Sequence, residues 1–236
     1  MEKQTNTQNT ILYSISILIF QNGYSFFVLN ENEKYIEDCK EIRVKNTQDS
    51  NISQLIKEEF EAIWKLKYPK SSLNIFYQHP YFSIVPREIY QTEQASDYLK
   101  YNTELFPSDS ISCDQNEAFN VAIPFIPFVN IHNEFLNHYT SLDFYHSINS
   151  ALKWSFQLSK NQSGEHAFVY IQQNTFLLVL IRSGKLQMAN YFSFDTAEDF
   201  AYYCLFAIEQ FKFDKENMHF SFVGNMPEES EIYAYM

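Results

Sequence analysis

The sequence predicts an α/β protein with mixed sheets, built from two halves that each run strand, strand, strand, helix, strand. Residues 11–77 and 167–223 both show this order of apolar patterns. Residues 176–181 form a continuous apolar run, which is typical of a strand buried on both faces. Aromatic residues make up 18% of the chain, a bias that favours sheets because such side chains pack well on pleated surfaces. We therefore expect two sheets facing a cleft, with the first half over residues 1–160 and a second, shorter half over residues 161–236.

The first half begins with three strands. Apolar and small polar residues alternate over residues 11–20, which predicts a strand. Residues 21–23, Gln-Asn-Gly, are a strong hairpin signal, because an Asn-Gly pair accepts the positive φ of a tight turn. This turn leads to strands over residues 24–29 and 35–44. Residues 11–20 are too short to span a bilayer and lack the cationic flank of a signal peptide, so we expect no transmembrane segment.

An amphipathic helix and a fourth strand complete the order of the first half. Apolar residues recur every three or four positions over residues 52–64, which is the spacing of one helix face. The helix is expected to end before Pro69, because the residue before a proline disfavours helical backbone. Strands are then predicted over residues 73–77 and 82–85, with a bend between them at His79-Pro80.

The remainder of the first half is less regular. Pro86 suits the first turn of a helix, so a helix is predicted over residues 87–105, with Ile89, Tyr90, Tyr98 and Leu99 facing inward. Residues 107–116 are predicted to form a polar loop, and residues 118–123 a strand that Pro124 ends, because proline cannot donate to a central ladder. Three further predicted elements are a short helix over residues 131–139, a strand over residues 142–145, and an amphipathic helix over residues 147–158 with Ile148, Leu152, Trp154, Phe156 and Leu158 on its apolar face.

The second half repeats the opening order. Strands are predicted over residues 168–173, 176–181 and 186–194, joined by turns at Asn174 and at Ser183-Gly184. Thr196 is a good N-cap residue with Asp199 three positions later, and the helix that follows over residues 197–211 is apolar almost all round. Such a helix is usually covered on more than one side. The final predicted elements are a strand over residues 219–223, a turn at Gly224-Asn225 and a helix over residues 227–235.

Charge and composition exclude several classes of function. A formal net charge of -12 argues against a nucleic-acid partner, because phosphate binding depends on lysine and arginine. The three cysteines match no zinc spacing and no disulfide framework, which favours a reducing cytoplasm. His132, His138 and His146 share no helix face and no ligand spacing. We interpret them as surface or loop histidines and predict no metal site.

Three strings carry a resemblance to a known family. ILYSISILIFQNGYSFFVLN, YFSIVPREIY and NIHNEFLNHYTSLDFYHSINSALKWSF look like an uncharacterised bacterial family of actin-like proteins. The repeated strand, strand, strand, helix, strand order resembles the ribonuclease H-like fold, whose duplication builds the actin-like ATPases. The architecture is similar to the cytoplasmic actin-like components of type IV pilus and type II secretion systems. The chain stops at Met236, where such a second half normally continues, so a truncated chain and an unusually short half both stay open.

The nucleotide chemistry that this resemblance implies is missing. In actin-like ATPases an acidic D-x-G turn in each half holds phosphates and magnesium, but the corresponding turns here, residues 20–23 and 172–175, contain no carboxylate. The chain has only four glycines, each explicable as a turn residue. We predict no catalytic residue. The weak candidates for a residual nucleotide site are Gln21, Asn22, Gly23, Asn174, Gly224 and Asn225.

Two functions follow from this combination. The first is a non-catalytic actin-like protein that binds another protein as a scaffold or assembly factor in the cytoplasm, without a cofactor. The alternative is a diverged nucleotide-binding ATPase or phosphotransferase that binds ATP and magnesium in the cleft with acids from elsewhere, such as Asp195 or Glu198. A ribonuclease H-type nuclease is disfavoured, because Ser14 and Ser16 occupy the strand that would carry its metal-binding acids.

Overall fold

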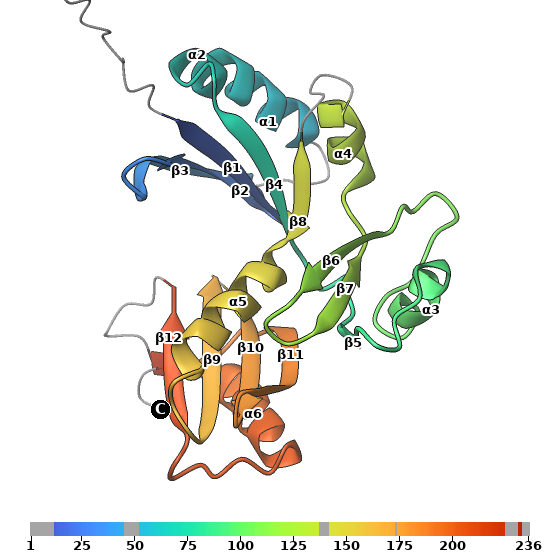
Figure 1. The fold of residues 1–236 in the computed structure, drawn as a ribbon, viewed down its shortest axis with the longest axis vertical. Helices are drawn as coiled ribbons and strands as arrows, with labels where there is room; N and C mark the ends of the chain where they lie inside the picture. The colour runs from blue at the N-terminus through green and yellow to red at the C-terminus, as the bar shows by residue number, and fades with distance from the viewer. Residues whose placement is uncertain (1–11, 45–51, 137–141, 173, 225–230, 233–236) are drawn as a thin grey trace, which may run out of the picture. The chain divides into compact units, whose positions relative to one another are not determined.

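The computed structural model describes residues 12–44, 52–136, 142–172, 174–224 and 231–232 of the 236-residue chain (Figure 1). The chain divides into two compact units. The first contains Met1–Gln78 and Pro127–Tyr145, and the second contains His79–Ile126 and His146–Met236. The predicted division at residues 1–160 and 161–236 follows the sequence repeat and stays a prediction.

The first unit is built on a five-stranded sheet with the order β3-β2-β1-β4-β8. β1 pairs antiparallel with β2 and parallel with β4, which confirms the predicted order of three antiparallel strands, a crossover helix and a parallel strand. The strands are β1 (Tyr13–Phe20), β2 (Gly23–Asn30), β3 (Tyr35–Arg43), β4 (Ser72–Gln78) and β8 (Asp143–His146).

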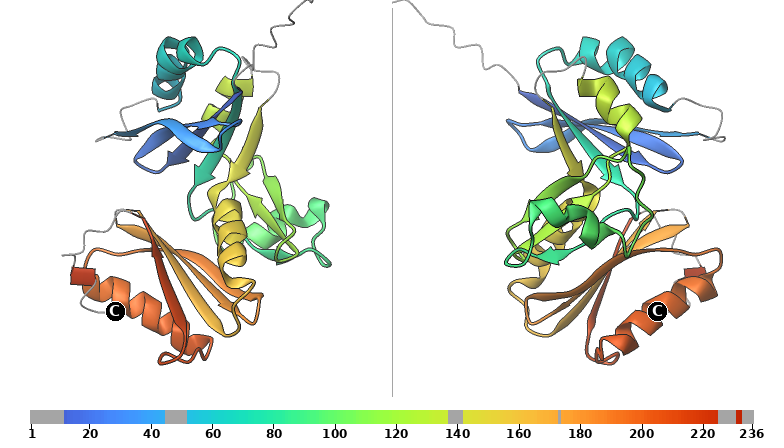
Figure 2. Two further views of the ribbon diagram at one scale, coloured as in Figure 1. Left: turned by 60° about the vertical axis from the view of Figure 1, so that its left-hand side comes forward. Right: turned by 90° about the vertical axis from the view of Figure 1, so that its right-hand side faces the viewer.

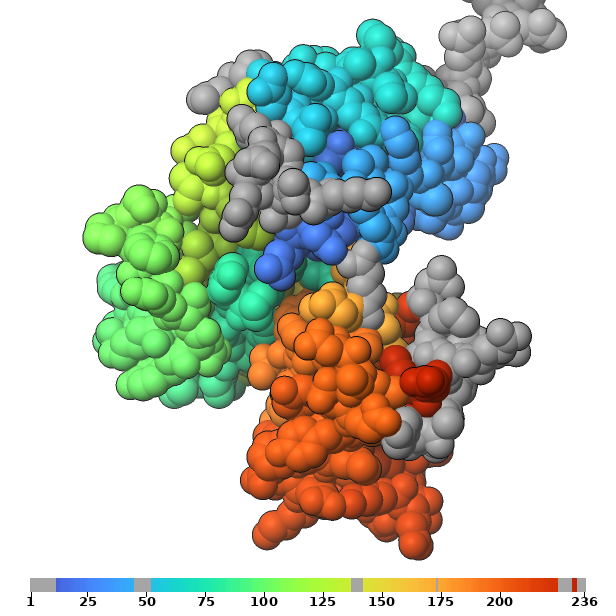
Figure 3. Space-filling model, turned by 180° about the vertical axis from the view of Figure 1, so that it is seen from behind, coloured from blue at the N-terminus to red at the C-terminus, as the bar shows by residue number. Residues whose placement is uncertain are grey.

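Helices cover one face of this sheet (Figure 2). The predicted helix at residues 52–64 is confirmed, but the structure divides it into α1 (Ile52–Glu59), a π-helical turn (Phe60–Trp64) and α2 (Lys65–Lys67). Together they form a continuous outer surface (Figure 3, cyan). α4 (Val129–Leu136) lies beside α1, where Lys57 and Glu134 form an ion pair of 2.5 Å.

The core of the first unit combines aliphatic strand residues with aromatic residues from both the strands and the helical segment. Ile15 and Ile17 of β1 and Ile75 of β4 are completely buried. Phe26 of β2 stacks on Trp64 at a ring-centroid distance of 5.1 Å. The alternation of the sequence therefore points the isoleucines toward the helices, while Ser14 and its neighbour Asn74 face the other way, joined by a 3.0 Å hydrogen bond.

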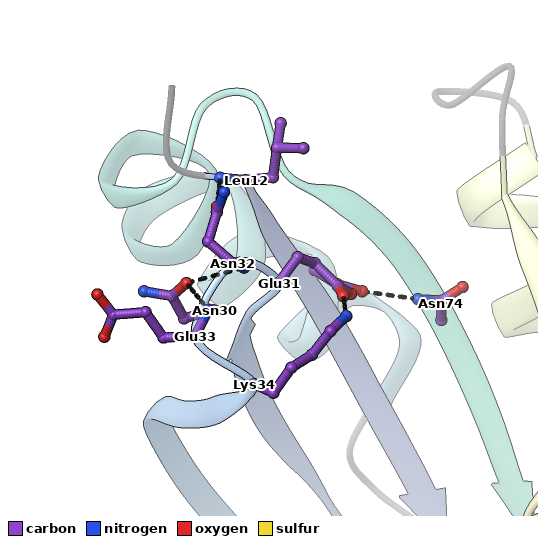
Figure 4. Close-up of polar contacts among 8 residues, drawn as sticks. Leu12, Asn30, Glu31, Asn32, Glu33, Lys34 and Asn74 are labelled. Atoms are coloured by element: carbon purple, nitrogen blue, oxygen red, sulfur yellow. Dashed lines mark hydrogen bonds and ion pairs between the residues drawn. The ribbon is translucent and has the colours of Figure 1, made fainter. Parts of the chain in front are cut away.

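An asparagine network fixes the turn between β2 and β3 (Figure 4). The buried Asn30 side chain accepts hydrogen bonds from the backbone amides of Asn32 and Glu33, both at 3.1 Å. Asn32 in turn accepts from the backbone amide of Leu12 at 2.7 Å, which ties the turn to the start of β1. Lys34 has a φ of 59° and completes the reversal of the chain. The polar joint predicted here is thus an ordered turn.

The second unit contains a four-stranded sheet with the same topology, in the order β11-β10-β9-β12. β9 pairs antiparallel with β10 and parallel with β12, as β1 pairs with β2 and β4. This repetition confirms the predicted duplication. The strands are β9 (Glu165–Gln172), β10 (Thr175–Arg182), β11 (Lys185–Ser193) and β12 (His219–Val223).

Two helices cover opposite faces of this second sheet (Figure 2). α6 (Ala197–Gln210) begins with the predicted capping box of Thr196 and Asp199 and packs on one face. α5 (Ser147–Ser159) packs on the other, where the Tyr170 hydroxyl bonds to the Ser155 hydroxyl at 2.7 Å. Every residue from Phe176 to Ile181 of β10 is at most 1% exposed, which confirms that this strand is buried on both faces.

Turn chemistry in the second sheet also follows the sequence. Ser183 and Gly184 both have positive φ, at 50° and 73°, as a two-residue hairpin of the favoured twist requires.

Arg182, the last residue of β10, links this end of the strand to the segment that follows α6. Its guanidinium donates to Glu165 at 2.5 Å and to the carbonyls of Phe211 and Lys212, just beyond the C-terminus of α6.

Residues 79–126 differ most from expectation. The helix predicted over residues 87–105 is wrong: the structure has only a short 3-10 turn, Thr92–Gln94, and α3 (Ala95–Leu99). Pro86 lies in a strand, Val85–Pro86, rather than at the start of a helix, and Ile89 is exposed. A three-stranded sheet occupies this region, in the order β5-β7-β6, with β5 (Val85–Pro86), β6 (Ser112–Asn116) and β7 (Val121–Phe125).

The loop predicted over residues 107–116 and the strand end predicted at Pro124 are therefore also wrong. β6 occupies the end of that loop, and Pro124 lies inside β7. Proline removes one donor but keeps its carbonyl, and the Pro124 oxygen accepts from the backbone amide of Ser83 at 2.9 Å. The ladder thus continues across it. In α5, Trp154 and Leu158 are exposed, contrary to prediction.

Candidate functional site

The first candidate site is the turn between β1 and β2. Gln21 and Asn22 form the turn, and both are exposed. β4 runs parallel to β1 and its last residue, Gln78, pairs with Phe20, so the carboxyl ends of both strands meet here. Open α/β sheets usually bind ligands outside this end of their strands. The structure therefore brings the candidate turn to the expected end of the first sheet.

Gly23, which opens β2, has a different role from the predicted one. Neither Asn22 nor Gly23 has a positive φ, so the mirror-image turn expected for an Asn-Gly pair is wrong. A Cβ at Gly23 would lie 2.2 Å from the carbonyl oxygen of Ile42 on β3. Glycine is required here because two backbones approach closely, which a side chain would prevent.

The second candidate site is the corresponding end of the second sheet. Asn174 lies in the turn between β9 and β10, and its carbonyl accepts from the backbone amide of Phe194 at 2.9 Å. Gly224 follows β12, which runs parallel to β9, so it lies at the same end. Its φ is 133°, and a Cβ there would lie 2.3 Å from the oxygen of Ile171. Asn225 lies outside the described residues.

The start of α6 lies at this same end, because Ser193 of β11 pairs with Thr175. Asp195 and Glu198 are exposed there. Asp199 is committed to the helix start: its carboxylate accepts from the backbone amides of Asp195 and Thr196 at 3.2 and 3.1 Å. These hydrogen bonds lower the pKa of Asp199. Asp195 and Glu198, which the alternative function could use, therefore lie at the same end of the second sheet as Asn174.

The side chains at the two turns have limited chemistry. Gln21, Asn22 and Asn174 are neutral, and magnesium bound in proteins usually has at least one carboxylate ligand. Within the described ranges, no group of three or more His, Cys, Asp or Glu side chains is arranged to hold a metal ion. What the turns do offer is backbone geometry: both glycines serve close approaches of neighbouring strands.

His146, in the second unit, is a buried histidine whose surroundings the sequence did not reveal. His146 is completely buried, so its interpretation as a surface or loop residue is wrong. Its Nε2 lies 3.0 Å from the carbonyl oxygen of His79, which can only accept, so Nε2 carries the proton. Its Nδ1 accepts from the backbone amide of Ile148 at 3.2 Å and caps α5. Burial holds the pKa of His146 well below 6.5, and the nearby His79 lowers it further.

Asp114 completes this polar cluster. Its carboxylate accepts from the backbone amide of His146 at 2.8 Å, and burial raises the pKa of Asp114 to about 6. Burial also lowers the pKa of the His79 side chain to about 4. The sequence signal for such a site was the position of His146 directly before a predicted helix, where a side-chain acceptor is favourable.

Asp114, His146 and Ser147 have the residue types of a hydrolytic triad but not its geometry. In a triad the carboxylate bonds to Nδ1 of the histidine, and Nε2 faces the serine. Here the carboxylate bonds to the histidine backbone, both ring nitrogens are used in the fold, and the Ser147 hydroxyl lies 3.1 Å from the hydroxyl of Tyr191. The cluster is therefore a structural joint between α5, β6 and the segment at His79.

His132, another histidine that we interpret from the sequence as a surface or loop residue, belongs to the first unit. His132 of α4 is half-buried, with its ring 4.0 Å from that of Phe144 between centroids, and burial lowers its pKa. His138 lies outside the described residues.

None of the described helices is long and apolar enough to cross a membrane.

A family model described as "Protein of unknown function (DUF3822)" matches residues 2–236. No curated protein sequence matches the chain. Among solved structures, a Bacteroides thetaiotaomicron VPI-5482 protein with an actin-like ATPase fold and unknown function is similar, with a TM-score of 0.82 and 20% identity. The match covers 94% of this chain and 86% of that one.

Two further structures come from secretion and pilus systems. The cytoplasmic domain of EpsL, an inner membrane component of the Vibrio cholerae type II secretion system, matches with a TM-score of 0.50 and 8% identity, covering 93% of this chain and 86% of that one. A chain of the PilM-PilN type IV pilus biogenesis complex matches with a TM-score of 0.53 and 11% identity, covering 85% and 66%. At these identities the likeness establishes the fold, which is actin-like.

Proposed function

We propose, from the premise that the chain belongs to the DUF3822 family and has an actin-like fold, that it is a non-catalytic protein that binds another protein as a scaffold or assembly factor. One observation carries the proposal. Both sheets keep the same strand order and pairing, while the turns at their carboxyl ends have no carboxylate. A fold kept without its phosphate and metal ligands is better suited to binding than to phosphoryl transfer.

The glycines support the same proposal. In an actin-like ATPase, glycines at these turns leave backbone amides open to phosphates. Here Gly23 and Gly224 each allow close packing against a neighbouring carbonyl oxygen, of Ile42 and Ile171 respectively. Their presence is thus explained by sheet geometry alone, without a ligand.

The solved structures indicate what kind of partner to expect. PilM is described in a complex with PilN, and EpsL is described as a component of the type II secretion system, so proteins with this fold occur in protein assemblies. By analogy we expect a protein partner and a cytoplasmic location for this chain. A net charge of -12 opposes binding to nucleic acid.

The alternative is a nucleotide-binding protein with a diverged site. It is favoured by the position of Asp195 and Glu198, which lie at the same end of the second sheet as Asn174 and Gly224. In this case an acid from the start of α6 would replace the missing acid of the hairpin turn.

A thermal-shift titration with ATP and magnesium tests the proposal. A ligand at 100 times its dissociation constant stabilises a folded protein by about 2.7 kcal/mol, which is easily measured as a rise in melting temperature. We expect no rise. A saturable rise that disappears with EDTA and weakens in the Asp195→Asn variant would refute the non-catalytic proposal and support the alternative.

A further inference from the structure

α6 presents large apolar side chains on the face that it turns away from its sheet. Tyr202, Leu205 and Phe206 are 61%, 47% and 48% exposed, although Phe200 and Ile208 on the opposite face are buried in the core. Residues 197–211 are apolar almost all round, and a helix of that kind is usually covered on more than one side. In the described part of the chain, only one side of α6 is covered.

The exposed side chains form an ordered surface. The rings of Tyr202 and Phe206, one helical turn apart, stack with centroids 5.9 Å apart. Tyr202 also contacts Tyr203 at 5.5 Å, and Tyr203 stacks on Phe192 of the edge strand β11 at 5.3 Å. We name these five residues the α6 patch: Phe192, Tyr202, Tyr203, Leu205 and Phe206. This face of the second unit is visible in Figure 3.

The rim of the α6 patch is acidic. α6 contains Glu198, Asp199 and Glu209 and has no lysine or arginine. Asp195 adds a further exposed carboxylate just before the helix. Lys215 pairs with Glu209 at the far end, so the acidic character is concentrated at the N-terminal end of the patch. The chain as a whole carries a net charge of -12, which attracts cationic partners over longer distances.

We propose that the α6 patch binds an amphipathic helix of a partner protein whose apolar face is flanked by lysine or arginine. The inference rests on the proposed scaffold function and specifies the chemistry of its partner. Tyr202 and Phe206 form a ridge along an i, i+4 row, and such a ridge packs into the groove of a second helix. Basic flanks would lie opposite Asp195 and Glu198.

The same charges make a second copy of this chain a poor partner. In a parallel two-fold pairing of α6 with its own copy, the acidic N-terminal ends of the two helices would face each other, and in any pairing each chain carries a net charge of -12. Like charges placed opposite each other in an interface are unfavourable. An anionic membrane surface is disfavoured for the same reason.

The probe is a fluorescein-labelled synthetic helix of Leu, Ala and Lys, with the leucines on one face and the lysines beside it. Fluorescence anisotropy measures its binding to the full chain. Two control peptides have the same length: one has a scrambled order of the same residues, and one has Glu in place of every Lys. We expect only the basic amphipathic peptide to bind, with an affinity that falls as salt is added.

Matched variants locate the binding surface. In Leu205→Ser/Phe206→Ser the dissociation constant should rise about tenfold or more, since a few well-packed residues near the centre of an interface carry most of its binding energy. The control is Trp154→Ser/Leu158→Ser on α5, whose side chains are 45% and 42% exposed and should not matter. Circular dichroism and melting curves establish that each variant is folded. If the first variant does not fold, Tyr202→Lys provides the same test at a single exposed position.

Several results would overturn the inference. The basic peptide could bind the α6 variant as tightly as wild type, or the acidic peptide could bind wild type as tightly as the basic one. An α6-dependent dimer in analytical ultracentrifugation, or α6-dependent binding to anionic lipid vesicles, would identify a different occupant of the patch. The scaffold function is judged separately. If a partner protein purified from the native host binds the α6 variant and wild type equally, that function stands and the assignment of the α6 patch fails.

Discussion

Replacing His146 with phenylalanine tests whether the buried histidine is a neutral structural joint. Phenylalanine keeps a planar ring but removes both ring nitrogens. The variant loses the cap on the Ile148 amide and the donor to the His79 carbonyl. A lost N-cap costs about 1 kcal/mol, and a buried carbonyl left without its donor costs about 1 to 3 kcal/mol. At pH 8 we therefore expect the free energy of unfolding to fall by about 2 to 4 kcal/mol.

The difference between wild type and variant should depend on pH. The folded-state pKa of His146 lies well below the ordinary value of 6.5, so below pH 6.5 protons bind the unfolded chain first. Wild type therefore loses stability as the pH falls through this range. For one histidine that stays neutral in the folded state down to pH 5, the loss between pH 8 and pH 5 is about 2 kcal/mol. Because the variant lacks this histidine, the gap between the two proteins should narrow by about 2 kcal/mol at pH 5.

The titration of Asp114 changes the free energy of unfolding in the opposite direction, but by the same amount in wild type and variant, so it cancels in their difference. Its pKa is raised from 3.8 to about 6, so its folded form binds a proton more tightly and stability rises as the pH falls through this range. Both proteins keep Asp114, and its hydrogen bond comes from the backbone amide of position 146, which the substitution leaves in place.

Urea denaturation at pH 8 and pH 5 measures both effects. The midpoint and slope are compared for wild type, His146→Phe and Gln157→Ala, a control at an exposed position of the same helix. Gln157→Ala should differ little from wild type at either pH. A gap between wild type and His146→Phe that is the same at both pH values would refute the assignment of His146 as neutral in the folded state.

Three further predictions concern the sheets and are measured by urea denaturation. Phe176→Ala should lower the free energy of unfolding by about 3 to 5 kcal/mol, because the Phe176 side chain is completely buried. A much smaller decrease would contradict the packing on α6. Gly23→Ala should cost about 1 kcal/mol or more, since its Cβ meets a backbone oxygen, whereas Gln21→Ala should stay within about 0.5 kcal/mol. Arg182→Met should lower the free energy of unfolding by about 1 to 3 kcal/mol. A double-mutant cycle with Glu165→Gln should show that the two side chains are coupled, and additive decreases would refute their interaction.

The duplicated core could be predicted from the sequence because local and long-range signals agree there. The continuous apolar run at residues 176–181 indicated a strand buried on both faces, and α5 and α6 supply those two covers. Ser183-Gly184 and the Thr196–Asp199 capping box are local signals, and each has the predicted geometry. Where every level of the sequence favours the same structure, the order of elements follows directly.

Residues 79–126 could not be predicted because their structure depends on partners distant in sequence. Val85–Pro86 is only two residues long and becomes a strand through pairing with Val121 and Ala122 of β7. β6 contains Asp114 and Asn116, which are polar yet buried, so its pattern resembles a loop. Their hydrogen bonds to His146 and Asn149 exist only after α5 is in place. A hydrophobic pattern cannot reveal a strand whose inward side chains are polar.

The candidate turns show why a motif that is present can be misread. Asn22-Gly23 predicts a hairpin, and the hairpin exists, but not through the positive φ that makes this pair favourable. Gly23 is needed because Ile42 of the third strand approaches it, a contact that no local pattern contains. Gly224 meets Ile171 in the same way. Since both glycines are required for strand packing whether or not a nucleotide binds, their presence does not indicate a phosphate site, and the decision between the two functions rests on the acids near α6.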